Sequence, residues 1–221
     1  MSGQPVLDVA DPGERANLSA FLGCALRQDE AAAVRLRRRG PRHVSAWVST
    51  GFETLATRTV EGVLGVEDTT VGADLVQAGL RAAGPIDLGY SMDSAWRGAL
   101  PPADGFVHLE DVPARTLVRL SERGAALAKE HGGRHGPPSG LLDQTVLTVS
   151  AGEDRVEVPM RVVFALTAMD FIPHSGERAE AHRIDATEIV RVRATASWLR
   201  IDARYGSVAR RRGGGFPIFP N

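Results

Sequence analysis

The sequence is short of two residue types, cysteine and lysine. Its 221 residues contain one cysteine, Cys24, and one lysine, Lys129. A single cysteine excludes an internal disulfide framework and any metal site built from several cysteines, and it fits a reducing compartment. No apolar run reaches the roughly 18 residues that a membrane-spanning helix needs. The first fifteen residues lack a basic stretch followed by an apolar one, so we expect no secretory signal. We therefore expect a cytoplasmic protein that does not contact a membrane.

The scarcity of lysine is matched by an abundance of arginine. There are 25 arginines, yet the formal net charge is −1, so no global charge draws the chain to DNA or to an anionic membrane. Arginine, alanine and glycine share GC-rich codons, and all three are frequent. Codon bias is thus one explanation of the arginine count. It weakens any arginine cluster as evidence for a nucleic-acid surface.

Motifs of known catalytic chemistry are missing. The sequence has no Gly-x-Ser-x-Gly, no phosphate-binding Gly-x-x-x-x-Gly-Lys-Ser/Thr and no strand followed by Gly-x-Gly-x-x-Gly. His131 and His135 are four residues apart, but glycines place them in a loop. His108-Leu109-Glu110 has the His-x-Glu of deaminases without their Pro-Cys-x-x-Cys. We expect no cofactor and no metal site, and whether the chain is an enzyme stays open.

Hydrophobic periodicity predicts an α+β fold. Asp11-Pro12-Gly13-Glu14 has the form of a helix start. The spacing predicts helices over 16–27, 70–83, from 112 to before 132, and 160–172, and strands over 33–37, 44–49, 54–60, 145–149, 155–158, 189–195 and 198–205. The helix over 160–172 is apolar nearly all round, which indicates a central buried helix. Residues 84–106 read as irregular and residues 210–215 as a mobile tail.

These elements form antiparallel meanders and hairpins rather than βαβ units, and they pack with about four helices. We expect one α+β domain over residues 1–221. The alternative is a subdivision into 1–131 and 141–212, joined by the Gly/Pro-rich loop between them.

The final hairpin carries the first candidate site. With Ala196-Ser197 as a two-residue turn, Arg193 faces Arg200 and Arg191 faces Asp202. One face then carries Arg191, Arg193, Trp198, Arg200 and Arg204. The other carries Val190, Val192, Leu199, Ile201 and Tyr205 and belongs against the core. Opposed arginines repel, so Asp202, an acidic partner or a phosphate must compensate.

An aromatic ring among arginines on a sheet is one way to hold single-stranded nucleic acid. The structural interpretation is a solvated arginine face, with Trp198 covered by a helix or a second subunit. A second basic run contains Arg35, Arg37, Arg38, Arg39 and Arg42.

Charge is also unevenly distributed. Residues 67–112 hold eight acids and two arginines, a net charge of −6, whereas residues 188–221 hold seven arginines and two acids, a net charge of +5. Such asymmetry indicates internal pairing, a homodimer of complementary surfaces, or a basic binding face.

The irregular segment 90–102 carries the second candidate site. It brings Asp93, Trp96 and Arg97 close in sequence, and His108 follows. As a functional loop it closes over a small ligand or a peptide. As plain structure, Trp96 packs the loop onto the core and Arg97 pairs with Asp93.

Three stretches carry a resemblance. They are Ala95–Pro102, Val158–Leu166 and Trp198–Val208. Together they resemble a family of hypothetical proteins of high-GC Gram-positive bacteria. The resemblance implies a bacterial cytoplasmic origin and no assigned activity, and it transfers no catalytic residue.

The leading hypothesis is a non-enzymatic interaction module, as a homodimer, whose basic sheet face binds nucleic acid or an acidic protein. The alternative is a small-ligand-binding protein or an enzyme with a pocket at the 90–102 loop.

Overall fold

One antiparallel sheet runs through most of the chain. The computed structural model describes residues 5–131, 138–152, 154–176 and 179–212. Eight strands pair in the order β6-β2-β3-β4-β13-β12-β11-β8. In chain order these are β2 (Ala33–Arg38), β3 (His43–Ser49), β4 (Leu55–Glu61), β6 (Asp68–Gly72), β8 (Val107–Pro113), β11 (Ile189–Ala194), β12 (Trp198–Ala203) and β13 (Gly206–Arg211). Four strands precede residue 73 and four follow residue 106. We call residues 5–98 the N-terminal half and residues 101–212 the C-terminal half.

The two halves are joined edge to edge in this sheet. β13 pairs with β4 through Ser207 with Thr57, Val208 with Ala56 and Ala209 with Leu55. Two smaller sheets complete the strands. One has the order β5-β1-β7, and the other pairs β10 with β9. Their strands are β1 (Val6–Asp8), β5 (Val63–Leu64), β7 (Ile86–Asp87), β9 (Thr145–Ala151) and β10 (Asp154–Pro159).

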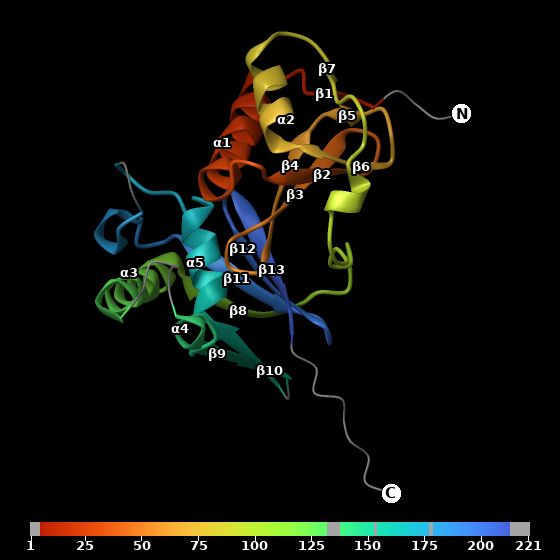
Figure 1. The fold of residues 1–221 in the computed structure, drawn as a ribbon. Helices are drawn as coiled ribbons and strands as arrows, with labels where there is room; N and C mark the ends of the chain where they lie inside the picture. Colours follow the sequence, from red (N-terminus) through yellow and green to blue (C-terminus); the bar gives the residue numbers. More distant parts are fainter. Residues whose placement is uncertain (1–4, 132–137, 153, 177–178, 213–221) are drawn as a thin grey trace, which may run out of the picture.

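Two pairs of helices lie against the same side of the large sheet, one pair in each half (Figure 1). α1 contacts α2, and α3 contacts α5. The α-helices of the described chain are α1 (Pro12–Gln28), α2 (Ala73–Arg81), α3 (Ala114–His131), α4 (Ser139–Leu142) and α5 (Met160–Ala168). α1 begins as predicted, because the Asp11 carboxylate accepts a 2.8 Å hydrogen bond from the backbone N–H of Glu14 and Pro12 opens the helix. Within the described chain, no helix combines the length and apolarity needed to cross a lipid bilayer.

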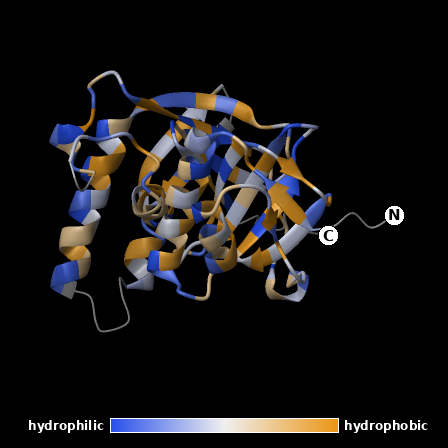
Figure 2. Cartoon of the chain, turned by 90° about the horizontal axis from the view of Figure 1, so that it is seen from above, coloured by the Kyte–Doolittle hydropathy of each residue, from blue (hydrophilic) through white to orange (hydrophobic). Residues whose placement is uncertain are grey.

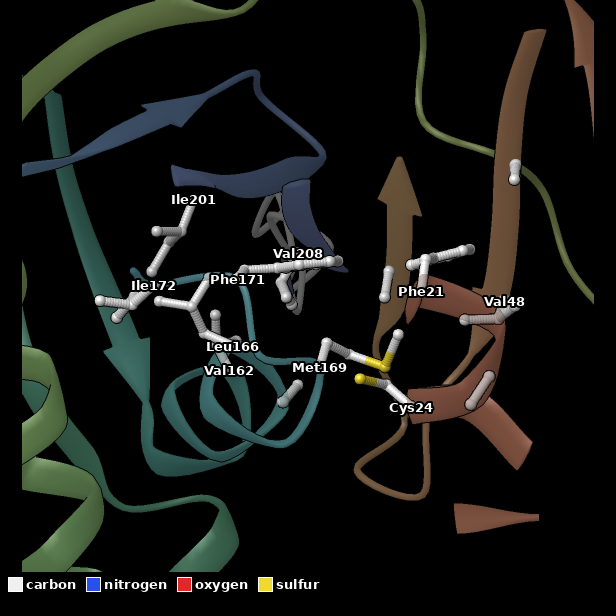
Figure 3. Packing of buried hydrophobic residues seen from close by; sticks show 14 of the residues in the cluster. Phe21, Cys24, Val48, Val162, Leu166, Met169, Phe171, Ile172, Ile201 and Val208 are labelled. Carbon is white, nitrogen blue, oxygen red and sulfur yellow. The ribbon is translucent and has the colours of Figure 1, made fainter. Parts of the chain in front are cut away.

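The hydrophobic core lies between the helices and the inward face of the sheet. Hydrophobic and hydrophilic residues intermix along the elements, as expected where each buries one face (Figure 2). Figure 3 shows side chains of α1, β3, α5 and the β12–β13 hairpin meeting in one interior. Phe21 stacks on Phe171, with ring centroids 6.1 Å apart. Gly206 lies beside this ring, and a Cβ there would sit 2.5 Å from Phe171 Cε1. The β12–β13 turn therefore approaches the core as closely as a glycine permits.

α5 is the predicted central helix, and it is buried from Met160 to Leu166. One of these residues is Arg161, whose side chain is 5% exposed. Its guanidinium donates to Asp143 Oδ1 at 2.6 and 3.0 Å, to Glu53 Oε2 at 2.7 Å and to the Phe52 carbonyl at 3.1 Å. Since Phe52 and Glu53 belong to the β3–β4 turn, Arg161 fastens the two halves together.

The α+β class, the three-stranded meander β2-β3-β4, the β9–β10 hairpin and the central helix are confirmed. The described chain has five α-helices, against about four predicted. Two helix starts were placed wrongly. Thr70, predicted to cap a helix, lies in β6, where the β-branched run Thr69-Thr70-Val71 pairs with β2. Val112, predicted to open α3, lies in β8, which ends at Pro113.

Besides β6 and the short strands β1, β5 and β7, two strands of the large sheet were missed. β8 was missed because a register shift opposite Val192 and Arg193 breaks the alternation of its side chains. β13 was missed because the arginines at its end, Arg210 and Arg211, obscure the strand pattern around the buried Val208 and Ala209. Arg210 and Arg211 therefore belong to a strand, whereas residues 213–215 of the predicted tail lie outside the described residues. Residues 132–137 of the predicted Gly/Pro-rich loop also lie outside them.

Candidate functional site

The final hairpin forms with the predicted register. Arg193 pairs with Arg200 and Arg191 with Asp202. Val192 and Ile201 face the core and are fully buried. The arginines of β11 and β12 therefore lie on the sheet face that points away from the core, which we call the outward face.

Asp202 lies between the two opposed arginines. One carboxylate oxygen lies 3.3 Å from Arg193 Nε, and the other lies 2.9 Å from Arg200 Nε. Arg200 Nη2 donates to Asp202 at 3.2 Å, and the Ser207 hydroxyl donates at 2.6 Å. The Arg200 guanidinium also lies 4.2 Å from the ring centroid of Phe106, a cation–π contact. The predicted repulsion is thus compensated in part within the chain.

Trp198, Arg204 and Tyr205 differ from the prediction. Trp198 is only 6% exposed and lies 5.6 Å from the Arg211 guanidinium, so it is not an open stacking surface. β12 ends at Ala203, which places Arg204 in the turn rather than on the strand, and Arg204 forms an ion pair of 2.6 Å with Glu188. Tyr205, predicted to face the core, is 41% exposed in the same turn.

The segment before β8 closes the edge of β6. The backbone N–H of Met92 donates to the Thr70 carbonyl at 2.7 Å, and the Thr70 N–H donates to the Asp93 carboxylate at 2.8 Å. A hydrogen bond from Ser91, reinforced by Thr70, lowers the pKa of Asp93. This side chain is thereby committed to holding the segment in place.

The four residues of the second candidate site do not converge. Trp96 lies under the Arg35 guanidinium, 5.9 Å from it, and its indole N–H is buried without an acceptor in the described chain. Asp93 bonds to β6, and the expected pair between Asp93 and Arg97 does not form. Arg97 is exposed. His108 lies on β8, where its Nε2 is 3.4 Å from Asp111. No cluster of three or more histidine, cysteine or acidic side chains occurs in the described part of the chain.

A groove brings together arginines of the second basic run and of the final hairpin. Its volume is about 950 Å³, and residues 100–103 form one wall. Its arginines are Arg37, Arg38, Arg39, Arg58, Arg200 and Arg204. Three of them belong to the second basic run, two to the final hairpin, and Arg58 comes from β4. Sequence reasoning missed Arg58, although its position in phase with the buried Ala56 and Val60 marks it as a charge on the core-facing side of its strand.

Arg58 is a half-buried arginine of the groove. It pairs with the core-facing Ala46, so its side chain leaves β4 on the helical side of the sheet. The side chain has no hydrogen bond to the described residues and no carboxylate within 4.0 Å. Burial lowers the pKa of Arg58, and its guanidinium lies 5.6 Å from the Tyr205 ring centroid. Arg39 is exposed and likewise has no carboxylate within 4.0 Å in the described chain, while Arg37 approaches Asp68 only to 3.9 Å. The groove therefore keeps unneutralised positive charge.

The fold is similar to that of bacterial DNA polymerase sliding clamps over about two thirds of their length. The chain is similar to the β sliding clamp of Caulobacter crescentus, with a TM-score of 0.58 and 14% identity over 99% of this chain and 68% of that one. DNA polymerase III subunit beta from Borrelia burgdorferi gives a TM-score of 0.56 and 9% identity over 97% and 66% of the two chains. The Pseudomonas aeruginosa subunit gives 0.54 and 13% over 93% and 65%. At these identities the likeness concerns the fold.

The sequence itself matches two family models. Residues 2–98 match a domain of unknown function, DUF8010, and residues 101–215 match a second domain of unknown function, DUF8185. The second match covers more than half of the chain, so the chain belongs to the DUF8185 family. A search of curated protein sequences finds no significant match.

Proposed function

We propose that the chain is a non-enzymatic module of the sliding-clamp fold that binds nucleic acid through this arginine-lined groove. The observation that carries this proposal is the charge of the groove. Six arginines line it against three acids, Glu14, Glu67 and Asp202. Three of the arginines have no carboxylate oxygen closer than 3.9 Å in the described chain.

The chemistry of the groove fits a phosphate backbone. Guanidinium groups bind phosphate with paired hydrogen bonds, and the hydroxyls of Thr57, Thr59 and Ser207 line the same groove. Trp47 and Tyr205 also line it and supply aromatic surface for base stacking. In this proposal these two rings, rather than Trp198, stack on the bases. Arg191 and Arg193 extend the basic surface beyond the groove, and the structural neighbours are proteins named as DNA polymerase clamps.

Binding of a labelled mixed-sequence oligonucleotide, measured by fluorescence anisotropy, tests the proposal. Affinity should fall steeply between about 50 and about 200 mM salt. Arg37→Glu with Arg39→Glu should weaken binding about tenfold or more and lower the single-strand salt slope by about 1 to 2. Both residues are exposed, so the folded state should persist.

Arg119→Glu with Arg123→Glu on α3 is the matched control, since these exposed arginines carry the same charge on the helical side. Loss of binding in this control, with the groove variant unchanged, would move the interface to the helices and refute the groove. Absence of any binding at about 50 mM salt would refute the proposal as a whole. Equal, arginine-dependent binding of poly-glutamate would assign the groove to an acidic protein instead.

A small ligand is the second candidate, because residues 100–103 wall a groove large enough for one. A thermal-shift screen of metabolites distinguishes it: a ligand that stabilises the wild type but not the groove variant supports this reading. We also propose that the chain acts as one unit, forms a homodimer and works in a bacterial cytoplasm. Light scattering coupled to size exclusion measures the oligomeric state.

A further inference from the structure

A second cavity lies at the opposite end of the β12–β13 hairpin. Its volume is about 350 Å³, and it lies between the β9–β10 hairpin and the ends of β12 and β13. Four arginines line it, Arg155, Arg210, Arg211 and Arg212, against two acids, Asp143 and Glu157. This site shares no arginine with the groove.

The nearer acid is already engaged. Asp143 accepts two hydrogen bonds from Arg161, and Arg210 approaches the same oxygen only to 3.5 Å. Burial, followed by repulsion from Arg161, lowers the pKa of Arg210. Glu157, the other acid, accepts from the Thr145 hydroxyl at 3.2 Å. Arg161 pairs closely with both Glu53 and Asp143, whereas Arg210 has only the longer contact with the shared Asp143.

The other three arginines have no carboxylate within 4.0 Å in the described part of the chain. Arg211 lies against the Trp198 ring at 5.6 Å. Arg212 donates to the carbonyls of Thr195 at 2.8 Å and Arg155 at 3.2 Å, which fixes its guanidinium at the cavity without neutralising it. The Arg155 side chain is exposed. Arg211 leaves β13 on the face of its strand partner Trp198, opposite to Arg210. The cavity therefore gathers the positive charges of Arg155, Arg210 and Arg212 around a space large enough for a small anion.

We propose that this cavity binds a phosphate-type oxyanion. Planar guanidinium donors match the geometry of phosphate oxygens, and several converging arginines select an anion with two or more charges. Such an oxyanion can be free, as phosphate or diphosphate, or it can be the terminal phosphate of a nucleic acid. The site stands on its own charges and does not depend on nucleic acid in the groove.

Isothermal titration of the full chain with inorganic diphosphate at low salt tests the site. We expect saturable binding. Arg155→Gln with Arg210→Met should weaken it about tenfold or more, because each lost charge-assisted bond is worth about that factor. Arg119→Gln on α3 is the control for removal of an exposed charge and should leave the affinity unchanged. Matched circular dichroism spectra and melting curves establish that the variants are folded.

A second arm identifies the source of the oxyanion. An oligonucleotide with a 5′-phosphate should bind more tightly than its 5′-hydroxyl form if the natural ligand is a nucleic-acid end, and the preference should vanish in the Arg155→Gln, Arg210→Met variant. Equal binding of both forms, together with saturable diphosphate, assigns a free anion. No saturable binding of diphosphate, or equal binding by wild type and folded variant, overturns the proposal. The Arg37→Glu, Arg39→Glu variant should keep diphosphate binding, so the proposals for the groove and for the cavity can be confirmed or refuted separately.

Discussion

Replacement of Arg161 by methionine should destabilise the protein more than replacement of any surface arginine of a similar ion pair. The guanidinium is 5% exposed and makes four hydrogen bonds, of which the two to Glu53 and to the Phe52 carbonyl cross the junction of the two halves. Its acceptors differ in burial. Glu53 and Asp143 have 82% and 55% exposed side chains, so water replaces Arg161 around them. The Phe52 backbone carbonyl loses its hydrogen bond from Arg161, and methionine offers it no donor.

The expected loss is therefore near the lower end of the range for breaking a buried ion pair, about 3 kcal/mol. Urea unfolding followed by circular dichroism measures it. Arg183→Met is the control, since Arg183 pairs with Glu180 at 3.2 Å with side chains 37% and 40% exposed; such surface pairs contribute about 0 to 1 kcal/mol. Equal unfolding free energies for the two variants would refute the argument that Arg161 holds the halves together.

Three further predictions concern the core, the thiol and the edge of the sheet. Gly206→Ala should cost about 1 to 3 kcal/mol in unfolding free energy, because its Cβ would meet an aromatic ring at 2.5 Å, whereas Gly140→Ala, with nothing within 4 Å, should be neutral. Burial raises the pKa of Cys24, so Ellman's reagent should label it only after unfolding; rapid labelling of folded protein would contradict this. Hydrogen bonds from Ser91 and the β6 backbone lower the pKa of Asp93, so Asp93→Asn should lower the melting temperature near neutral pH, and the difference should shrink as the pH falls below about 4. A difference that persists in acid would show that charge is not involved.

Local features of the fold could be predicted from the sequence. The turn at Ala196-Ser197 sets the pairing of Arg193 with Arg200, because a two-residue turn leaves one register. The cap at Asp11 and the all-round apolar α5 likewise depend on neighbours in sequence. In each case the residues that determine the structure lie close together in the sequence.

Non-local pairing could not be predicted in this way. Nothing near Leu55 or Ala209 indicates that their strands pair across the junction of the halves. The groove depends on that pairing, because it brings Arg58 of β4 beside the β12–β13 turn. The prediction therefore found the arginines of the hairpin and of the β2–β3 region as two separate clusters. Trp198 was placed on the correct strand, but its burial depends on packing that periodicity does not encode.

The tie between the segment at Asp93 and strand β6 limits how copies of this chain can join their sheets. An unpaired strand edge accepts a strand from another molecule, and the middle of β6 has both backbone groups of Thr70 already occupied. β8, at the other end of the sheet, has no strand beyond it in the described chain. Head-to-tail addition needs both ends of the sheet and forms a ring or a filament. Strand addition at the β8 edge alone places β8 against β8 about a two-fold axis, and such a pair leaves no β8 edge to extend.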